Sequence, residues 1–427
     1  MEDDLDHRSS WDWVARAFGA LGVLLLAVSA AAVVFWPQPR QARPATAAPV
    51  VLDLPALLER EVQSVLRGQV DALLNGDEKG WLTPVDIAAQ SRYRAIYRNL
   101  RKLEISRADY GVEIREPSTE STVHARVMIG YCLGGATCPA WVDRVDEGAP
   151  KVLYDLTLTR RRDDYVVTKI ADVDDENYLQ PTPWENFELR FARGERVVVA
   201  GPPGQAKNLR RVLAAAEKAA TVVDRFSTEP PESYRIYLAD DKSWKRWYGG
   251  QLSTWVVGYH LALNQTGSDI VLKASQVLDS DRQLALTVQH EMAHAVTMVP
   301  SYNRDPDDDL WLIEGVADYI GFFPGKPQNT ESRYALRNWV DEHGALRSIV
   351  RPALTEKSDD LTVSTLYATG HYAVGCLVDG YGRARMLDFV KRVVRDGQEL
   401  DPASRASFGK PFKTVDKTCV SWITQRI

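Results

Sequence analysis

The chain has 427 residues, of which 45% are hydrophobic and 26% are charged, and its formal net charge is -6. This composition is typical of a globular protein, and it excludes a wholly disordered chain, a collagen-like chain and a polytopic membrane protein. The acidic balance offers no basic surface to a phosphate backbone, so we expect no nucleic acid among the partners. The length favours two or three domains.

The N-terminal region contains one long uncharged segment. Residues 1–16 are a short tail, and residues 17–36 carry no charge. As a helix this segment would be about 30 Å long, which is the thickness of a bilayer core, so we predict a single transmembrane helix there. A linker rich in Pro and Ala follows at 37–53. A cleaved secretory signal is the alternative, because residues 45–47 read Ala-Thr-Ala, like a cleavage site.

The four cysteines fall into two local pairs. Cys132 and Cys138 flank a glycine-rich turn, and Cys376 and Cys419 lie in the last sixth of the chain. An even set of this kind favours two disulfides in an oxidising compartment. We therefore expect a single-pass protein of the cell membrane, with a short N-terminal tail inside and everything after residue 36 outside the cytoplasm. Four buried free thiols are the alternative.

Residues 54–182 show helical periodicity first and strand periodicity afterwards. Apolar residues recur at helical spacing over 54–103, and strand-like runs follow. These runs occupy 108–114, 121–132, 151–159 and 164–170. Together with the phrase Ala-Leu-Leu-Asn-Gly-Asp at 72–77 and with Trp81, this order resembles the NTF2-like α+β cone fold. The resemblance implies an accessory domain, and because no convergent polar set is visible we expect it to be non-catalytic.

Residues 183–427 begin with strands and one amphipathic helix. We expect strands at 196–200 and 234–238, a helix at 208–226 between them, and a hairpin formed by 254–263 and 269–273. His260 stands in an aromatic context on this hairpin, so we interpret it as a core or edge residue and not as a ligand. A further helix begins at the N-cap Ser280, where Gln283 can complete a capping box, and ends before Pro300.

That helix carries the sequence His-Glu-Met-Ala-His at 290–294. Two histidines at i and i+4 project from one face of a helix, where both can bind one zinc ion, and Glu291 then stands beside a water molecule on the metal. Catalytic zinc needs a third protein ligand. Glu314, on a second predicted helix at 311–319, can supply it if that helix folds back on the first. Asp318 lies one turn further, where it can hydrogen-bond a ligand histidine.

This pattern resembles the gluzincin metallopeptidases, in which an HExxH helix precedes a helix carrying ExxxD. Metzincins are excluded, because Thr297 and Pro300 stand where their pattern needs Gly and His. The resemblance covers 183–427 and implies a zincin (thermolysin-like) α+β domain. The predicted fold class is thus α+β, with a transmembrane helix, a cone domain and a metallopeptidase domain in that order.

The resemblance also implies roles for individual residues. His290, His294 and Glu314 would bind Zn²⁺, Asp318 would support a ligand histidine, and Glu291 would act as general base. Tyr367 matches the family's oxyanion donor best, and its competitors are His371 and Tyr372. The alternative is that all three side chains only pack their helix. The substrate would add as a strand to the edge of the sheet, for which residues 268–275 are the candidate.

The sequence therefore predicts a membrane-anchored zinc metallopeptidase that acts on a peptide or protein substrate. The glutamate-bearing strand that one-residue-trimming members of the class use is not visible, so an endopeptidase is favoured. Two alternatives stay open. One is a non-catalytic binding or scaffold protein built on a decayed peptidase, and the other is a zinc hydrolase of a non-peptide amide, such as a cell-wall cross-link.

Overall fold

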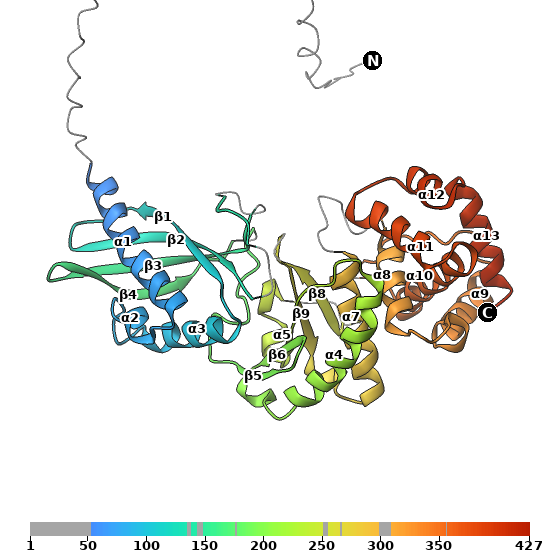
Figure 1. Cartoon of the computed structure of the whole chain (residues 1–427), viewed down its shortest axis with the longest axis horizontal. Coiled ribbons are helices and arrows are strands. Elements are labelled where there is room, and N and C mark those ends of the chain that lie inside the picture. The colour runs from blue at the N-terminus through green and yellow to red at the C-terminus, as the bar shows by residue number, and fades with distance from the viewer. Residues whose placement is uncertain are drawn as a thin grey trace, which may run out of the picture. The chain divides into compact units, whose positions relative to one another are not determined.

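The computed structural model describes residues 53–134, 138–142, 148–175, 177–250, 255–264, 267–298, 309–355 and 357–427. Two sheets and a set of helices make up this mixed α/β structure (Figure 1). The predicted segments 1–16, 17–36 and almost all of 37–53 lie outside the described residues. The division into domains at 182/183 stays a prediction, since Leu52–Ile427 is one compact unit.

The predicted fold class needs a correction at its membrane helix. Across the described residues, every helix is too short or too polar to span a lipid bilayer. Helix α1 (Leu54–Asn75), for example, has the length but carries charged side chains such as Glu61 and Arg67, which are costly in hydrocarbon. The predicted transmembrane anchor and the predicted single-pass placement in the cell membrane are therefore not supported, and the fold class becomes a mixed α/β structure.

The first sheet follows three helices. Helix α1 ends at Gly76, whose left-handed backbone closes the helix, and α2 (Glu78–Leu82) and α3 (Gln90–Lys102) come next. The sheet is antiparallel in the order β1-β2-β3-β4. Its strands are β1 (Arg107–Arg115), β2 (Thr122–Cys132), β3 (Lys151–Arg161) and β4 (Asp164–Asp172). The four strands predicted in this region are confirmed to within a few residues.

The second sheet has the order β5-β6-β7-β9-β8. Strands β6, β7 and β9 are parallel, whereas β5 and β8 pair antiparallel at the two edges. The strands are β5 (Arg190–Arg193), β6 (Val197–Gly201), β7 (Tyr234–Ala239), β8 (Gly258–Ala262) and β9 (Ser268–Lys273). Helix α4 (Leu209–Val223) connects β6 to β7. The sequence missed β5, which is only four residues long.

Strand β7 is buried along its whole length because both faces of the second sheet are covered. Ile236 and Leu238 face one hydrophobic core, which contains α4 and the C-terminal helices. Tyr237 and Ala239 point the other way, into a core shared with α1, α3 and the first sheet. This region also contains a buried ion pair, in which Arg235 Nε lies 2.7 Å from Asp269 Oδ1.

Helix α5 (Asp241–Trp244) lies between β7 and β8 in the chain. The remaining helices follow the second sheet. They are α6 (Ala274–Val277), α7 (Asp281–Thr297), α8 (Leu310–Gly321), α9 (Ser332–His343), α10 (Asp360–Tyr381), α11 (Arg383–Val390), α12 (Leu400–Phe408) and α13 (Phe412–Thr424). Both predicted disulfides are confirmed: Cys132 pairs with Cys138, and Cys376 on α10 pairs with Cys419 on α13.

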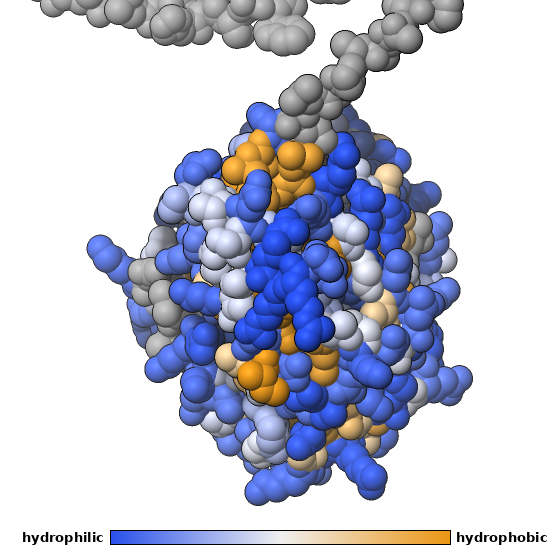
Figure 2. Space-filling view, turned by 90° about the vertical axis from the view of Figure 1, so that its left-hand side faces the viewer, coloured by the Kyte–Doolittle hydropathy of each residue, from blue (hydrophilic) through white to orange (hydrophobic). Residues whose placement is uncertain are grey.

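One face of the molecule is mostly hydrophilic and is interrupted by small apolar patches (Figure 2). Among the described residues, the large hydrophobic side chains that are exposed are Leu54, Leu57, Ile87, Leu179 and Tyr334. Scattered exposed apolar residues are ordinary on soluble surfaces, so they do not define a binding surface. The functional site must be sought in the concave and titratable parts of the structure.

Candidate metal centre

Helix α7 presents the two motif histidines. Its N-cap is Ser280, whose Oγ accepts a hydrogen bond from the backbone N–H of Gln283 at 3.0 Å. The Gln283 amide does not reach back to the cap but points forward to Thr287, with 3.3 Å from Nε2 to Oγ1. The predicted capping box is thus formed only in part. The i, i+4 spacing places His290 and His294 on the same side of the helix.

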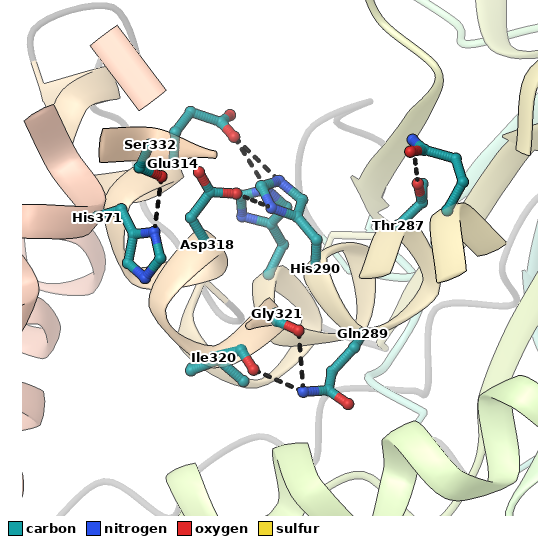
Figure 3. Close-up of polar contacts among 11 residues, drawn as sticks. Thr287, Gln289, His290, Glu314, Asp318, Ile320, Gly321, Ser332 and His371 are labelled. Atoms are coloured by element: carbon teal, nitrogen blue, oxygen red, sulfur yellow. Dashed lines mark hydrogen bonds and ion pairs between the residues drawn. The ribbon is translucent and has the colours of Figure 1, made fainter. Parts of the chain in front are cut away.

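Hydrogen bonds from the side chain of Gln289, the residue before the motif, connect helix α7 to helix α8. Its Nε2 donates to the carbonyl oxygen of Ile320 at 2.7 Å and to that of Gly321 at 3.2 Å (Figure 3). These carbonyls belong to the last turn of α8, which has no partners within its own helix. The contact fixes the end of α8 against the middle of α7. Sequence reasoning missed Gln289, because no local pattern identifies a partner 31 positions away.

Three side-chain donors from these helices converge. His290 Nε2 lies 3.2 Å from His294 Nε2 and 3.1 Å from Glu314 Oε2, and His294 Nε2 lies 3.6 Å from the same oxygen. A tetrahedral zinc ion with bonds of about 2.0 to 2.1 Å needs donors about 3.3 Å apart. The three side chains can therefore hold a metal ion, and their donor set fits zinc. The predicted Zn²⁺ cofactor is confirmed to this extent.

Asp318 contacts the first of these histidines. Its Oδ1 lies 2.9 Å from His290 Nδ1, and Figure 3 shows Asp318 and Glu314, both from α8, pointing toward His290. A carboxylate in this position accepts the Nδ1–H of the imidazole, which leaves Nε2 unprotonated for a metal. The structure thus brings together the four residues predicted as ligands and support, while the role of Asp318 stays a prediction.

Burial and mutual attraction set the charges of this cluster. Burial alone would lower the pKa of His290, but its hydrogen bonds with Asp318 and Glu314 prevail and raise the pKa well above its ordinary value. Burial raises the pKa of Glu291, against the attraction of His290 and His294. In Glu314, attraction and hydrogen bonds from the two histidines overcome burial and lower the pKa of the carboxyl. The His290 imidazole and the Glu314 carboxylate thus stabilise each other's charged forms.

A cleft of about 420 Å³ opens beside the donors. Helices α7 and α8 contribute His290, Glu291 and Asp318 to its lining, and the chain from Trp255 to Gly258 lines it as well. A Cβ atom on Gly258 would lie 2.8 Å from Glu291 Oε1, so a larger residue at this position would require the Glu291 side chain to shift. Glu291 therefore lies against Gly258 and borders the cleft beside His290.

The strand along the cleft is β8, at the edge of the second sheet. The prediction that residues 268–275 form the edge is wrong, because β9 is paired on both sides, with β7 and with β8. The order of strands is decided by tertiary pairing, and the last strand before the metal helix need not be the outermost. The same hairpin supplies the edge, but its first strand takes that place.

Tyr367 borders the cleft from α10. Its ring centre lies 6.1 Å from that of His290. Burial, followed by the nearby Glu314 and Asp318 carboxylates, raises the pKa of Tyr367, so its hydroxyl keeps the proton and can donate a hydrogen bond. Its predicted role as oxyanion donor remains a prediction.

A close helix crossing brings Tyr367 to this position. Helix α10 crosses α8 where Gly370 meets Gly315, and a Cβ on Gly315 would lie 2.4 Å from the Gly370 carbonyl carbon. Gly315 directly follows Glu314, and Gly370 stands three residues after Tyr367. Contact between the two backbones therefore sets how near Tyr367 comes to the metal donors.

The two competitors of Tyr367 are buried away from the cleft. His371 and Tyr372 are both fully buried, and neither lines the cleft. His371 Nδ1 lies 3.0 Å from Ser332 Oγ (Figure 3). The ring of Tyr372 packs edge-on against Trp422. Of the three candidates, Tyr367 alone borders the cleft.

Solved structures are similar to this chain at low sequence identity. No family model and no curated protein matches the sequence. A structure of native yeast LTA4 hydrolase aligns with 74% of this chain at 12% identity and a TM-score of 0.38, and its complex with bestatin with 75% at 15% and 0.35. This chain spans 59% and 57% of the length of those two chains. Neither similarity is strong enough to define the fold, so the site must be judged by its own geometry.

Proposed function

We propose that the protein is a zinc-dependent hydrolase of peptide bonds. The observation that carries this proposal is the convergence of three metal donors at a cleft that is also bordered by the Glu291 carboxylate. Donors alone are compatible with a structural zinc site, but structural sites are closed by a fourth protein ligand. Here the described residues supply three donors, and one of them, His290, lines an open cleft, as a catalytic site requires.

The residues then have distinct tasks. An ion held by His290, His294 and Glu314 would polarise a substrate carbonyl and acidify a water molecule. Glu291 accepts the proton of the attacking water at its carboxylate and delivers it to the leaving nitrogen. Tyr367 donates its hydroxyl proton in a hydrogen bond to the oxygen on which charge develops, a contact typically worth about 10² to 10³ in rate.

Strand β8 supplies the binding edge for the substrate. Among the described strands it pairs only with β9, so its outer backbone groups are available to an extended peptide. Backbone pairing of this kind orients the scissile bond without selecting a side chain. We therefore propose a peptide or protein substrate that is cleaved internally, by an endopeptidase.

The decisive variant is Glu291→Gln, which preserves size and removes the base. We expect it to retain about one zinc per chain and to lose about 10² to 10⁴ in kcat/KM on a peptide library, since general-base catalysis contributes that much. Glu331→Gln is the matched control, because it makes the same change in the wall of the same cleft. It should keep both zinc and most of the activity.

Three results would contradict the proposal in whole or in part. Undiminished activity in Glu291→Gln would show that another group is the base. Loss of zinc together with activity would make Glu291 structural. If zinc-loaded wild-type protein cleaves no peptide in the library, the peptide substrate is wrong even though the metal site stands.

A further inference from the structure

Two buried imidazole nitrogens on neighbouring rings, one of them on a metal-donor histidine, have no hydrogen-bond partner among the described residues. His294 Nε2 is one of the three donors, but its Nδ1 is buried and has no partner among the described residues. The same holds for Nε2 of His260, on strand β8. The two ring centres are 6.2 Å apart, with the planes inclined by 39°. Two orphaned nitrogens on neighbouring rings need a common explanation, because buried polar groups are rarely left unsatisfied.

The two ligand histidines differ in their support. His290 has Asp318 to accept its Nδ1–H. Within the part of the chain that the structure describes, His294 has no carboxylate or carbonyl in that place, although a metal-bound imidazole almost always donates its second N–H to an acceptor. If Nε2 of His294 binds the ion, its Nδ1 must carry the proton. The nearby acceptor that lacks a partner is Nε2 of His260.

The alternation of β8 explains why His260 points this way. Gly258 faces Glu291 on α7, and His260, two residues further, shares that side of the strand. Tyr259, between them, points to the other side and donates its hydroxyl proton to the carbonyl oxygen of Trp247 at 3.1 Å. Gly258 and His260 therefore lie on the side of strand β8 that faces helix α7.

We propose that His260 is a positioning residue for the metal centre, holding His294 in the ligand tautomer through one buried water. The water accepts a hydrogen bond from Nδ1–H of His294 and donates one to the unprotonated Nε2 of His260. A water bound to two such partners is an ordinary element of a buried polar site. His260 thus does for His294 what Asp318 does for His290, and it links the substrate-binding strand to the ion.

The inference rests on the zinc site of the proposed function, and zinc affinity tests it in the full chain. By competition with a fluorescent chelator, we expect His260→Leu to bind zinc about 10 to 100-fold more weakly than wild type. His260→Gln should recover most of that loss, because its amide oxygen is again an acceptor. Tyr259→Phe is the control on the same strand and should bind as wild type. The visible spectrum of the cobalt-substituted chain should change in His260→Leu and not in Tyr259→Phe.

A second measurement avoids dependence on the variants. In ¹⁵N NMR of the histidine-labelled, zinc-loaded wild-type chain, Nδ1 of His294 should be protonated and Nε2 of His260 unprotonated. A proton on His260 Nε2 would overturn the inference, as would wild-type affinity in His260→Leu or equal loss in the Leu and Gln variants. If wild-type protein binds no zinc, the proposed function fails with it. If wild type binds zinc and His260→Leu binds it equally, only this inference fails.

Discussion

The two sheets each border a concave space, and the two spaces differ in what fills them. Between the first sheet and its helices the cavity measures about 30 Å³ and is lined by apolar and aromatic side chains such as Leu66 and Trp81. The cleft beside α7 measures about 420 Å³ and has His290 and Glu291 in its wall. The first space is closed by the protein's own core, whereas the second leaves room for a ligand next to titratable groups.

Each region also contains a buried carboxylate, and the two carboxylates differ in their hydrogen-bond partners. The Glu185 carboxylate, near the first sheet, accepts hydrogen bonds from Tyr154 Oη at 2.6 Å and Gln180 Nε2 at 2.9 Å. Glu291 has no side-chain hydrogen bond with the described residues and borders the cleft. Burial raises the pKa of both groups. A raised pKa therefore does not by itself mark a catalytic acid; the absence of partners beside an open cleft separates the two.

The two disulfides differ in the length of the chain segment that each one closes into a loop. Removing the Cys376–Cys419 bridge, which spans 43 positions, should lower the free energy of unfolding by about 4 kcal/mol in the chain-entropy model. Removing Cys132–Cys138, which spans six positions, should cost about 2 kcal/mol. Urea unfolding of the two double Cys→Ser variants measures both values. A larger loss from the short loop would contradict this order.

The two carboxylates allow a paired test with the same substitution. Glu185→Gln should lower the free energy of unfolding by about 1 to 3 kcal/mol, since it breaks a buried hydrogen-bond network. Glu291→Gln should leave the stability of the metal-free chain within about 0.5 kcal/mol of wild type, because no such network is lost. Thermal unfolding with chelator present compares them. Equal destabilisation would remove the distinction between a structural and a catalytic carboxylate.

A smaller effect is expected from the support of the first ligand. Asp318→Asn keeps the shape of the side chain and removes its charge, so zinc affinity should fall by about 10 to 100-fold, while the fold is retained. Chelator competition measures the affinity, and circular dichroism checks the fold. Affinity equal to that of wild type would mean that the 2.9 Å contact with His290 does not tune the ligand.

Each helix or strand that forms within its own short segment of the chain was predictable from the local sequence pattern. The spacing of 290–294 and the ExxxD order predicted which residues meet, because two helix faces must pack if Glu314 is to reach the histidines. Gln289 and His260 could not be assigned in this way. Their roles depend on residues that only tertiary packing brings near, and the strand order that makes β8 the edge depends on pairing between distant segments.

The zinc content of the purified full chain tests the central claim most directly. Wild-type protein should contain about one zinc ion per chain after dialysis against metal-free buffer, and Glu314→Ala should contain almost none, because it removes one of three protein ligands. Elemental mass spectrometry of both proteins, prepared in parallel, gives the ratio. Equal zinc content in the two proteins, or none in wild type, would contradict the assignment of His290, His294 and Glu314 as the metal centre.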